Sequence, residues 1–254
     1  MPRSIRSPSS PETLNEQLSY LKLNYLLEHY DALATEAAQA QWTHVQYLAC
    51  LIEGEALERQ QRSIQRRIRQ ARFPLIKTLD AFQWTWPNKL NRAQVQNLFR
   101  LKFIDEHANI IFLGGVGLGK THLATALGHA ACLKGYTVLF TTAVDVINTL
   151  NAAQQTGQLK SAFNRYLKPA LLILDELGYL PIDKNGADLL FQIISQRYER
   201  GTMIVTSNRV FKKWPEIFNN DATLTSALLD RLLHHAETVL IEGKSYRMKD
   251  QIET

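Results

Sequence analysis

The stretch Gly114-Gly115-Val116-Gly117-Leu118-Gly119-Lys120-Thr121 decides the fold of this 254-residue chain. It matches the phosphate-binding loop pattern G-x-x-x-x-G-K-[ST] in full. Apolar residues 109–113 precede it and predict a strand, and residues 122–134 predict a helix that ends before Gly135. Glycines allow the backbone to aim several N–H groups at phosphate oxygens, and the helix N-terminus adds a favourable dipole. The sequence therefore predicts a phosphate-binding loop between a strand and a helix.

The residue types of the loop suit a nucleotide with its metal ion. We expect Lys120 to neutralise the β and γ phosphates and Thr121 to offer its hydroxyl to Mg²⁺. The other residues expected to contact the nucleotide are Gly114, Gly115, Val116, Gly117, Leu118, Gly119 and His122. A glycine-rich turn in an unrelated α/β fold is the alternative, and the flanking strand and helix disfavour it.

A second apolar run, residues 171–174, ends in Asp175 and Glu176, 55 positions after Lys120. A buried parallel strand delivers its last residues to the edge of the sheet where ligands bind. Asp175 is therefore expected to hold the metal, and Glu176 to polarise the attacking water. An acidic turn explains this pair when it is taken alone, but the combination with the phosphate loop favours catalysis.

Two further polar residues follow apolar runs. Asn208 comes at the end of the apolar run that begins at Thr202, and either it, or Thr206 or Ser207 beside it, orients the hydrolytic water, or the polar residues here cap a helix; the spacing leaves both roles open. Arg231 lies in an apolar helical run and is either a surface residue, paired with Asp230 or Asp221, or an arginine finger for a neighbouring subunit. The adjacent His234 and His235 indicate a metal site only weakly, since no third ligand lies nearby in the sequence.

Short β-rich runs alternate with helical segments at residues 109–113, 137–142, 170–175, 202–206 and 238–242. This alternation predicts an α/β fold with a five-stranded parallel sheet between helices. Before it, spacings of three to five residues predict one apolar helix face across residues 18–33 and a second helical run over 43–71, which Pro74 ends. The predicted organisation is a disordered tail (1–11), a helical domain (12–75), a linker with a short helix at 91–104 (76–104) and the nucleotide-binding domain (105–254).

Composition excludes several classes of protein. No stretch reaches the ~18 apolar residues of a membrane span, and the first ten residues lack the apolar core of a secretory signal. Two cysteines are too few for a disulfide scaffold. With 45% hydrophobic and 21% charged residues, the chain is expected to be a soluble cytoplasmic protein without a membrane partner.

Basic charge is concentrated between residues 59 and 72, which hold six arginines and no acid, while the whole chain has a net charge of +5. Such a block indicates an anionic partner such as double-stranded DNA, and a solvated helix face is the plainer alternative. On a helix four of these arginines share one face, which leaves them free to follow a phosphate backbone. The candidate DNA-binding residues are Arg59, Arg62, Arg66, Arg67, Arg69 and Arg72.

These motifs together resemble the IstB-like ATP-binding proteins of bacterial insertion sequences, which are AAA+ ATPases related to the DnaC helicase loaders. The resemblance is carried by GGVGLGKTHLA (114–124), LLILDELGYLP (171–181), TSN (206–208), LLDRLLHHA (228–236) and the N-terminal EGEALERQQRSIQRRIRQARFP (53–74).

The resemblance implies ATP and Mg²⁺ as cofactors, Asn208 as first sensor and Arg231 as a finger that acts on the adjacent subunit. Ser245-Tyr246-Arg247 resembles a motif of the helicase loaders, in which Arg247 would touch the γ phosphate. Only 12 residues follow Glu242, so we expect an AAA+ domain without a C-terminal helical lid.

The function implied is that of an ATP-dependent helper of transposition. It would hydrolyse ATP, assemble on target DNA as a homo-oligomeric ring or helical filament, and engage the transposase encoded alongside. A replicative helicase loader of the DnaC type is the alternative. Two other classes remain, a small-molecule P-loop kinase and a nucleotide switch that does not hydrolyse ATP. ATP turnover measured with and without duplex DNA separates them.

Overall fold

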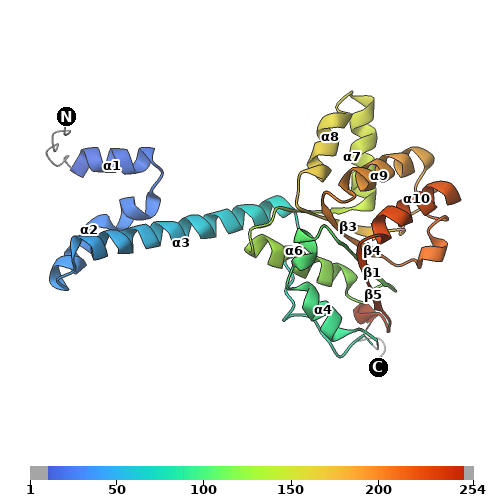
Figure 1. The fold of residues 1–254 in the computed structure, drawn as a ribbon, viewed down its shortest axis with the longest axis horizontal. Helices are drawn as coiled ribbons and strands as arrows, with labels where there is room; N and C mark the ends of the chain where they lie inside the picture. The colour runs from blue at the N-terminus through green and yellow to red at the C-terminus, as the bar shows by residue number, and fades with distance from the viewer. Residues whose placement is uncertain (1–10, 88, 249–254) are drawn as a thin grey trace. The chain divides into compact units, whose positions relative to one another are not determined.

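In the computed structural model, five parallel strands form one sheet in the order β2-β3-β4-β1-β5 (Figure 1). The strands are β1 (Asn109–Gly114), β2 (Val138–Thr142), β3 (Leu171–Leu177), β4 (Thr202–Ser207) and β5 (Ala236–Ile241). The central strands are buried on both faces, which explains their nearly continuous apolar sequences. The predicted five-stranded parallel sheet is confirmed, and the strand ends differ from the prediction by at most two residues.

Helices cover both faces of this sheet because right-handed crossovers place a helix according to the direction in which the chain moves. α6 (Lys120–Leu133) connects β1 to β2 and packs on one face. The chain then returns in the opposite direction, and its helices lie on the other face (Figure 1). They are α7 (Ala143–Gln155), α8 (Leu159–Leu167), α9 (Lys184–Arg197) and α10 (Ala222–Leu233).

The main core lies between the sheet and this second layer, and it includes a buried arginine. Trp214, Tyr166 and Phe218 are among its largest fully buried side chains. Arg197 is 2% exposed, and burial lowers its pKa to about 10, so the guanidinium stays charged at neutral pH. It donates at 2.7–3.3 Å to the carbonyls of Tyr166, Leu167, Pro169, Ala170 and Thr202. These bonds tie the end of α9 to the beginnings of β3 and β4.

The structure describes residues 11–87 and 89–248, which divide into two units between Gln65 and Arg66. The first unit holds α1 (Pro11–Tyr20), α2 (Asn24–Gln39) and most of α3 (His44–Ala71). The expected single helix face across residues 18–33 is wrong, because the chain turns between α1 and α2 at Lys22, whose φ is +57°.

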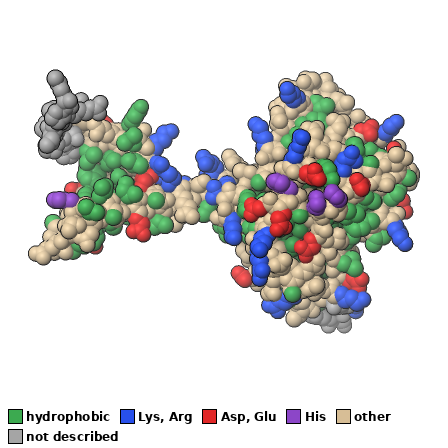
Figure 2. Space-filling view, in the orientation of Figure 1, with side chains coloured by type: hydrophobic (Ala, Val, Ile, Leu, Met, Phe, Trp, Pro, Cys, Tyr) green, Lys and Arg blue, Asp and Glu red, His purple; other side chains and the backbone are tan. Residues whose placement is uncertain are grey.

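A small core of leucines, Leu18, Leu26 and Leu51, holds the first unit together. Other apolar side chains remain on its surface, and Figure 2 shows hydrophobic side chains gathered on one face of this unit. The strongly exposed large apolar residues of the first unit are Tyr20, Leu21, Val45, Leu48, Ile52 and Leu57. The predicted tail, residues 1–11, lies outside the described residues except for Pro11, which begins α1.

Residues 73–105 belong to the second unit and pack against the rest of it. The predicted helix at 91–104 is divided into α4 (Arg92–Leu98) and α5 (Lys102–Asp105) by Leu101, whose φ is +61°. Phe73 packs beside Gly128 of α6, and Phe82 is buried. The segment expected to be a linker therefore forms part of the fold. Among the described helices, none has both the length and the apolar character needed to cross a bilayer.

Candidate nucleotide-binding site

The phosphate loop runs from the end of β1 to the beginning of α6. Gly117 and Gly119 have φ values of +75° and +88°, in the region that favours glycine. Space is restricted as well, because a Cβ on Gly119 would lie 2.7 Å from the ring of Phe82, and one on Gly117 would collide with Ser245. Both glycines are thus required by backbone conformation and by close approach of another segment.

Lys120 and Thr121 begin α6, so their side chains lie beside the loop. The Lys120 ammonium donates to the carbonyls of Gly114 at 2.7 Å and Gly115 at 2.6 Å. The Thr121 hydroxyl lies 3.0 Å from both carboxylate oxygens of Asp175. A hydrogen bond therefore joins the beginning of α6 directly to the end of β3.

Asp175 is 3% exposed, and this burial raises its pKa. Hydrogen bonds from Thr206 and Thr121 act in the opposite direction, as does the charge of Lys120. The Thr206 hydroxyl donates to Asp175 Oδ1 at 2.5 Å. A buried carboxylate beside a threonine hydroxyl is a set of hard oxygen donors, which is the kind of site that Mg²⁺ prefers. The residues present therefore fit the predicted metal.

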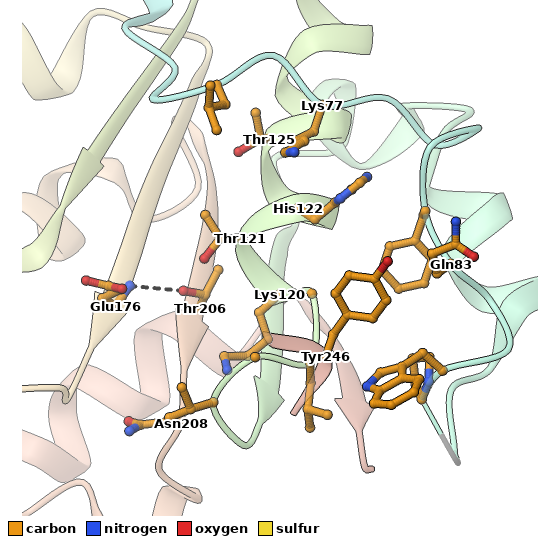
Figure 3. A pocket seen from close by; sticks show the side chains of 18 of the residues that line it. Lys77, Gln83, Lys120, Thr121, His122, Thr125, Glu176, Thr206, Asn208 and Tyr246 are labelled. Carbon is orange, nitrogen blue, oxygen red and sulfur yellow. Dashed lines mark hydrogen bonds between the residues drawn. The ribbon is translucent and has the colours of Figure 1, made fainter. Parts of the chain in front are cut away.

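Glu176 has an unusual backbone for a strand residue. Its φ is +60°, and the pairing of β3 with β4 shifts register between Leu174 and Leu177. The Glu176 N–H donates to the Thr206 hydroxyl at 3.0 Å (Figure 3). At this bulge the two consecutive acids have different surroundings, because Asp175 is buried against Thr121 while Glu176 is exposed. Strained backbone of this kind is typical of functional sites.

A cavity of about 660 Å³ opens above the phosphate loop. In Figure 3, Glu176, Thr206 and Asn208 lie on one side of Lys120, and Tyr246 lies on the other. Asn208 is exposed and follows β4 directly. The alternative role as a helix cap is wrong, because the next helical turn, η1 (Phe211–Lys213), begins after Val210. The structure thus brings residues 116–121 of the predicted loop, Glu176 and Asn208 together around one cavity, while Asp175 lies buried behind Thr121.

The opposite wall comes from residues 74–87, which sequence reasoning did not assign to the site. Phe82 lies edge-on to His122, with ring centroids 5.3 Å apart, and Gln83 lines the cavity. The His122 Nε2 lies 2.8 Å from the Thr78 carbonyl, and burial lowers the pKa of this histidine. Aromatic residues at 82, 84 and 86 were the available signal, because an exposed linker seldom carries three.

The C-terminal segment completes this wall. The Tyr246 N–H donates to the Gly117 carbonyl at 2.9 Å, and its ring lies edge-on to Trp86 with centroids 5.6 Å apart. Trp86 in turn donates from Nε1 to the Lys244 carbonyl at 2.8 Å. The backbone of Arg247 lies in η2, residues 246–248, but its side chain is outside the described part of the structure.

Arg231 is not among the described residues that line the cavity. Its guanidinium stacks 4.8 Å above the ring of Phe191 in α9 and donates to the Ala227 carbonyl at 2.9 Å. Neither Asp230 nor Asp221, both of which the structure describes, forms an ion pair with it. The arginine is therefore held by an aromatic ring and by its own helix.

Of the six candidate DNA-binding arginines, two lie in the first unit and contact acids of their own helix. Arg62 pairs with Glu55 at 3.2 Å and with Glu58 at 3.7 Å. Arg59 pairs with Glu55 at 3.7 Å. The acids that these two arginines contact, Glu55 and Glu58, precede the arginine block in the sequence. The side chain of Arg59 is still 61% exposed, and that of Arg62 is 41% exposed.

The other four arginines lie in the second unit. Arg66 and Arg69 are exposed. Arg67 donates from Nε to the carbonyl of Cys132 at 3.0 Å, which fastens the end of α3 to the end of α6. Arg72 follows α3 with a φ of +59°, so it does not continue the helical face. Arg66 and Arg69 thus remain the clearest candidates for contact with an anionic partner.

The sheet order, the phosphate loop and the paired acids define a nucleotide-binding protein of the AAA+ P-loop class. Solved structures agree with this. AMPPCP-bound DnaA from Aquifex aeolicus superimposes with a TM-score of 0.57 and 26% identity, over 72% of this chain and 55% of that chain. The DnaC helicase loader has a TM-score of 0.53 and 24% identity, over 65% of this chain and 96% of that chain, and shows the likeness of fold.

The family is shown by the sequence comparisons. The family model described as IstB-like ATP binding protein matches residues 16–254, and the chain belongs to this family. A putative ATP-binding protein of insertion sequence IS5376 from Geobacillus stearothermophilus is 40% identical over 94% of this chain and 95% of its own length. The putative ATP-binding protein of IS21 from Pseudomonas aeruginosa is 40% identical over 92% of this chain and 88% of its own length.

Proposed function

We propose that this protein is a Mg²⁺-dependent ATPase that assists DNA transposition. The observation that carries the proposal is the hydrogen-bonded connection from Thr121 through Asp175 and Thr206 to Glu176. It joins the residue expected at the metal to the residue expected at the water. A protein that only binds a nucleotide needs the phosphate loop, but it does not need an exposed acid fixed on a strained bulge beside it.

Each residue of the site has one task in this proposal. Lys120 neutralises the phosphates, and Thr121 and Asp175 hold Mg²⁺, which supplies positive charge to the phosphate oxygens when it is bound. Glu176 accepts a hydrogen bond from the attacking water and orients it. Asn208, on the same side of the cavity, contacts the γ phosphate or this water.

The adenine and ribose occupy the wall formed by residues 74–87 and Tyr246. A cavity of about 660 Å³ is within the usual range for small-molecule and cofactor sites. Trp86 and Tyr246 offer apolar rings, and Gln83 offers an amide that can bond the edge of a base. Bound AMPPCP in the DnaA structure supports a triphosphate as the ligand of this fold.

Arg231 completes the site of a neighbouring subunit in this proposal. Arg231 contacts Phe191 and Ala227 and does not line the nucleotide cavity of its own chain. An arginine supplied in trans stabilises charge that develops on the γ phosphate. Hydrolysis would then depend on a homo-oligomer, a ring or a helical filament, that forms on DNA.

DNA and a transposase are the proposed macromolecular partners. The named relatives are encoded by insertion sequences, and they match this chain through the first unit as well as the ATPase unit. The exposed Arg66 and Arg69 would contact the phosphates of duplex DNA. A helicase loader is less well supported, because the likeness to DnaC covers 65% of the chain and concerns the fold.

The test is ATP turnover with Mg²⁺, measured with and without duplex DNA. Glu176→Gln should bind ATP normally and lose about 10²-fold or more in turnover, because it removes the group that orients water. Lys120→Ala should weaken ATP binding itself. Glu106→Gln is the matched control, because Glu106 is exposed and precedes β1, at the other end of that strand from the loop.

Each result has a defined meaning. ATP binding without any turnover on DNA would favour the nucleotide switch. Phosphate transfer to an added small molecule would favour a kinase. Normal turnover by Glu176→Gln would remove Glu176 from its catalytic role.

A further inference from the structure

A cluster of three metal-binding side chains lies outside the nucleotide site. Glu199 follows α9, and His234 and His235 connect α10 to β5. One possible ligand atom from each lies within 4.8 Å of the others, and His235 Nε2 is 4.0 Å from Glu199 Oε1. All three side chains are exposed, so an ion can reach them from solvent. The fold thus supplies the third ligand that the His-His pair lacks in the sequence, from 35 residues earlier.

The chemistry of these groups suits zinc. Two imidazoles and one carboxylate are common Zn²⁺ ligands, and a water fills the fourth tetrahedral position. Zn–N and Zn–O distances near 2.0 Å require ligand atoms roughly 3.3 Å apart. A separation of 4.0 Å between His235 and Glu199 therefore closes with small rotations of exposed side chains.

Tyr198 gives the cluster an outer hydrogen bond. Its hydroxyl oxygen lies 2.7 Å from His234 Nδ1. With a metal on Nε2, the Nδ1–H of His234 would donate to this oxygen. Such outer bonds orient the ring of a ligating histidine in metal sites.

An exposed Glu-His ion pair is the ordinary alternative, and it would contribute little to stability. It accounts for His235 and Glu199 but does not involve His234, which the Tyr198 hydroxyl orients and whose ring centroid is 4.2 Å from that of His235.

We propose that Glu199, His234 and His235 bind one Zn²⁺ ion, which fastens the end of α9 to the end of α10. The ion would fix the geometry between the helix that carries Phe191 and the helix that carries Arg231. Their contact spans 4.8 Å, and His234 lies three residues after Arg231. The three ligands share no residue with the lining of the nucleotide cavity.

The test is a calorimetric titration of the full chain with Zn²⁺, without nucleotide and without a histidine tag, after treatment with a chelator. The expected stoichiometry is one ion per chain. Glu199→Gln and His235→Gln should each weaken binding at least tenfold, and Tyr198→Phe about tenfold. His44→Gln is the matched control, since His44 is an exposed histidine in the first unit, and it should bind like the unmodified chain.

Cobalt gives a second readout, because Co²⁺ in a tetrahedral site absorbs visible light. The absorption should appear with the unmodified chain and be lost in Glu199→Gln. That variant is isosteric and exposed, so it decides the question even if His235→Gln fails to fold. Zinc binding that is absent, or that survives both ligand substitutions, or that falls equally in His44→Gln, would overturn the proposal.

Discussion

Thr206 connects the two acids of the site through a single hydroxyl group. This hydroxyl donates to Asp175 Oδ1 at 2.5 Å and accepts the Glu176 N–H at 3.0 Å, and the residue is 1% exposed. Thr206→Val keeps the shape of the side chain but removes both hydrogen bonds. It therefore measures what this connection contributes, without opening a cavity.

The size of the effect follows from the two bonds. An unpaired buried N–H costs about 1–3 kcal/mol, and a hydrogen bond to a charged group contributes about 1.5–3 kcal/mol. The apolar valine offsets part of this loss, so we expect the free energy of unfolding to fall by about 2–4 kcal/mol. Loss of the Thr206 bond also removes one of the influences that lower the pKa of Asp175. Turnover should fall about 10²-fold, because a displacement of Glu176 near 1 Å is enough for that.

The assay combines urea unfolding with ATP binding and ATP turnover. Thr141→Val is the matched control, because Thr141 is a buried strand threonine, 7% exposed, with one long hydrogen bond of 3.3 Å to the Thr142 carbonyl. Thr206→Ser keeps the hydroxyl and should restore most of the turnover. Normal turnover and stability in Thr206→Val would refute the idea that this hydroxyl positions Glu176.

Three further predictions concern the partners of the site. Arg66→Glu combined with Arg69→Glu should weaken binding to unrelated duplex sequences, measured by fluorescence anisotropy. The slope of log affinity against log salt should become shallower by roughly 0.9 per lost phosphate contact. An unchanged salt dependence would show that these arginines form only a solvated face. Trp86→Ala should weaken ATP binding about tenfold on the scale of aromatic stacking with a base, by calorimetry, and an unchanged Kd would place the base elsewhere. Arg231→Ala should bind ATP but lose on the order of 10³-fold in turnover. Mixing it with Lys120→Ala should restore some activity if the arginine acts in trans. With mixed assemblies verified by light scattering, no recovery at any ratio would argue against Arg231 as an arginine finger.

The sheet and the phosphate loop were predictable because short stretches of sequence determine them. A strand buried on both faces has to be apolar, and the loop needs glycine at Gly117 and Gly119 for local backbone reasons. Asp175 and Glu176 could be placed at the same edge because parallel strands all end there. The sequence identifies their shared partner Thr206 only as an alternative to Asn208 for orienting water, since nothing in the spacing distinguishes these residues.

Other features depend on contacts that no short stretch encodes. The turn at Lys22 and the break at Leu101 have neither Gly nor Pro to mark them, and both residues adopt positive φ within otherwise helical patterns. The pairing of Arg62 with Glu55 depends on two turns of a helix, seven residues apart. The aromatic wall of the cavity and the approach of Glu199 to the two histidines join segments far apart in the chain, so only the folded structure reveals them.

The hydrogen bond from Trp86 to the Lys244 carbonyl joins residues 158 positions apart. The cavity can therefore be completed only after the C-terminal segment has been synthesised. The phosphate loop, residues 114–121, is synthesised well before Tyr246, which the wall facing the loop needs. A chain still attached to the ribosome and shorter than that cannot form the complete cavity, and contacts of such sequence separation are slow to form. A truncated or nascent chain would therefore bind nucleotide weakly. It would not hydrolyse ATP before its last segment has folded onto Gly117.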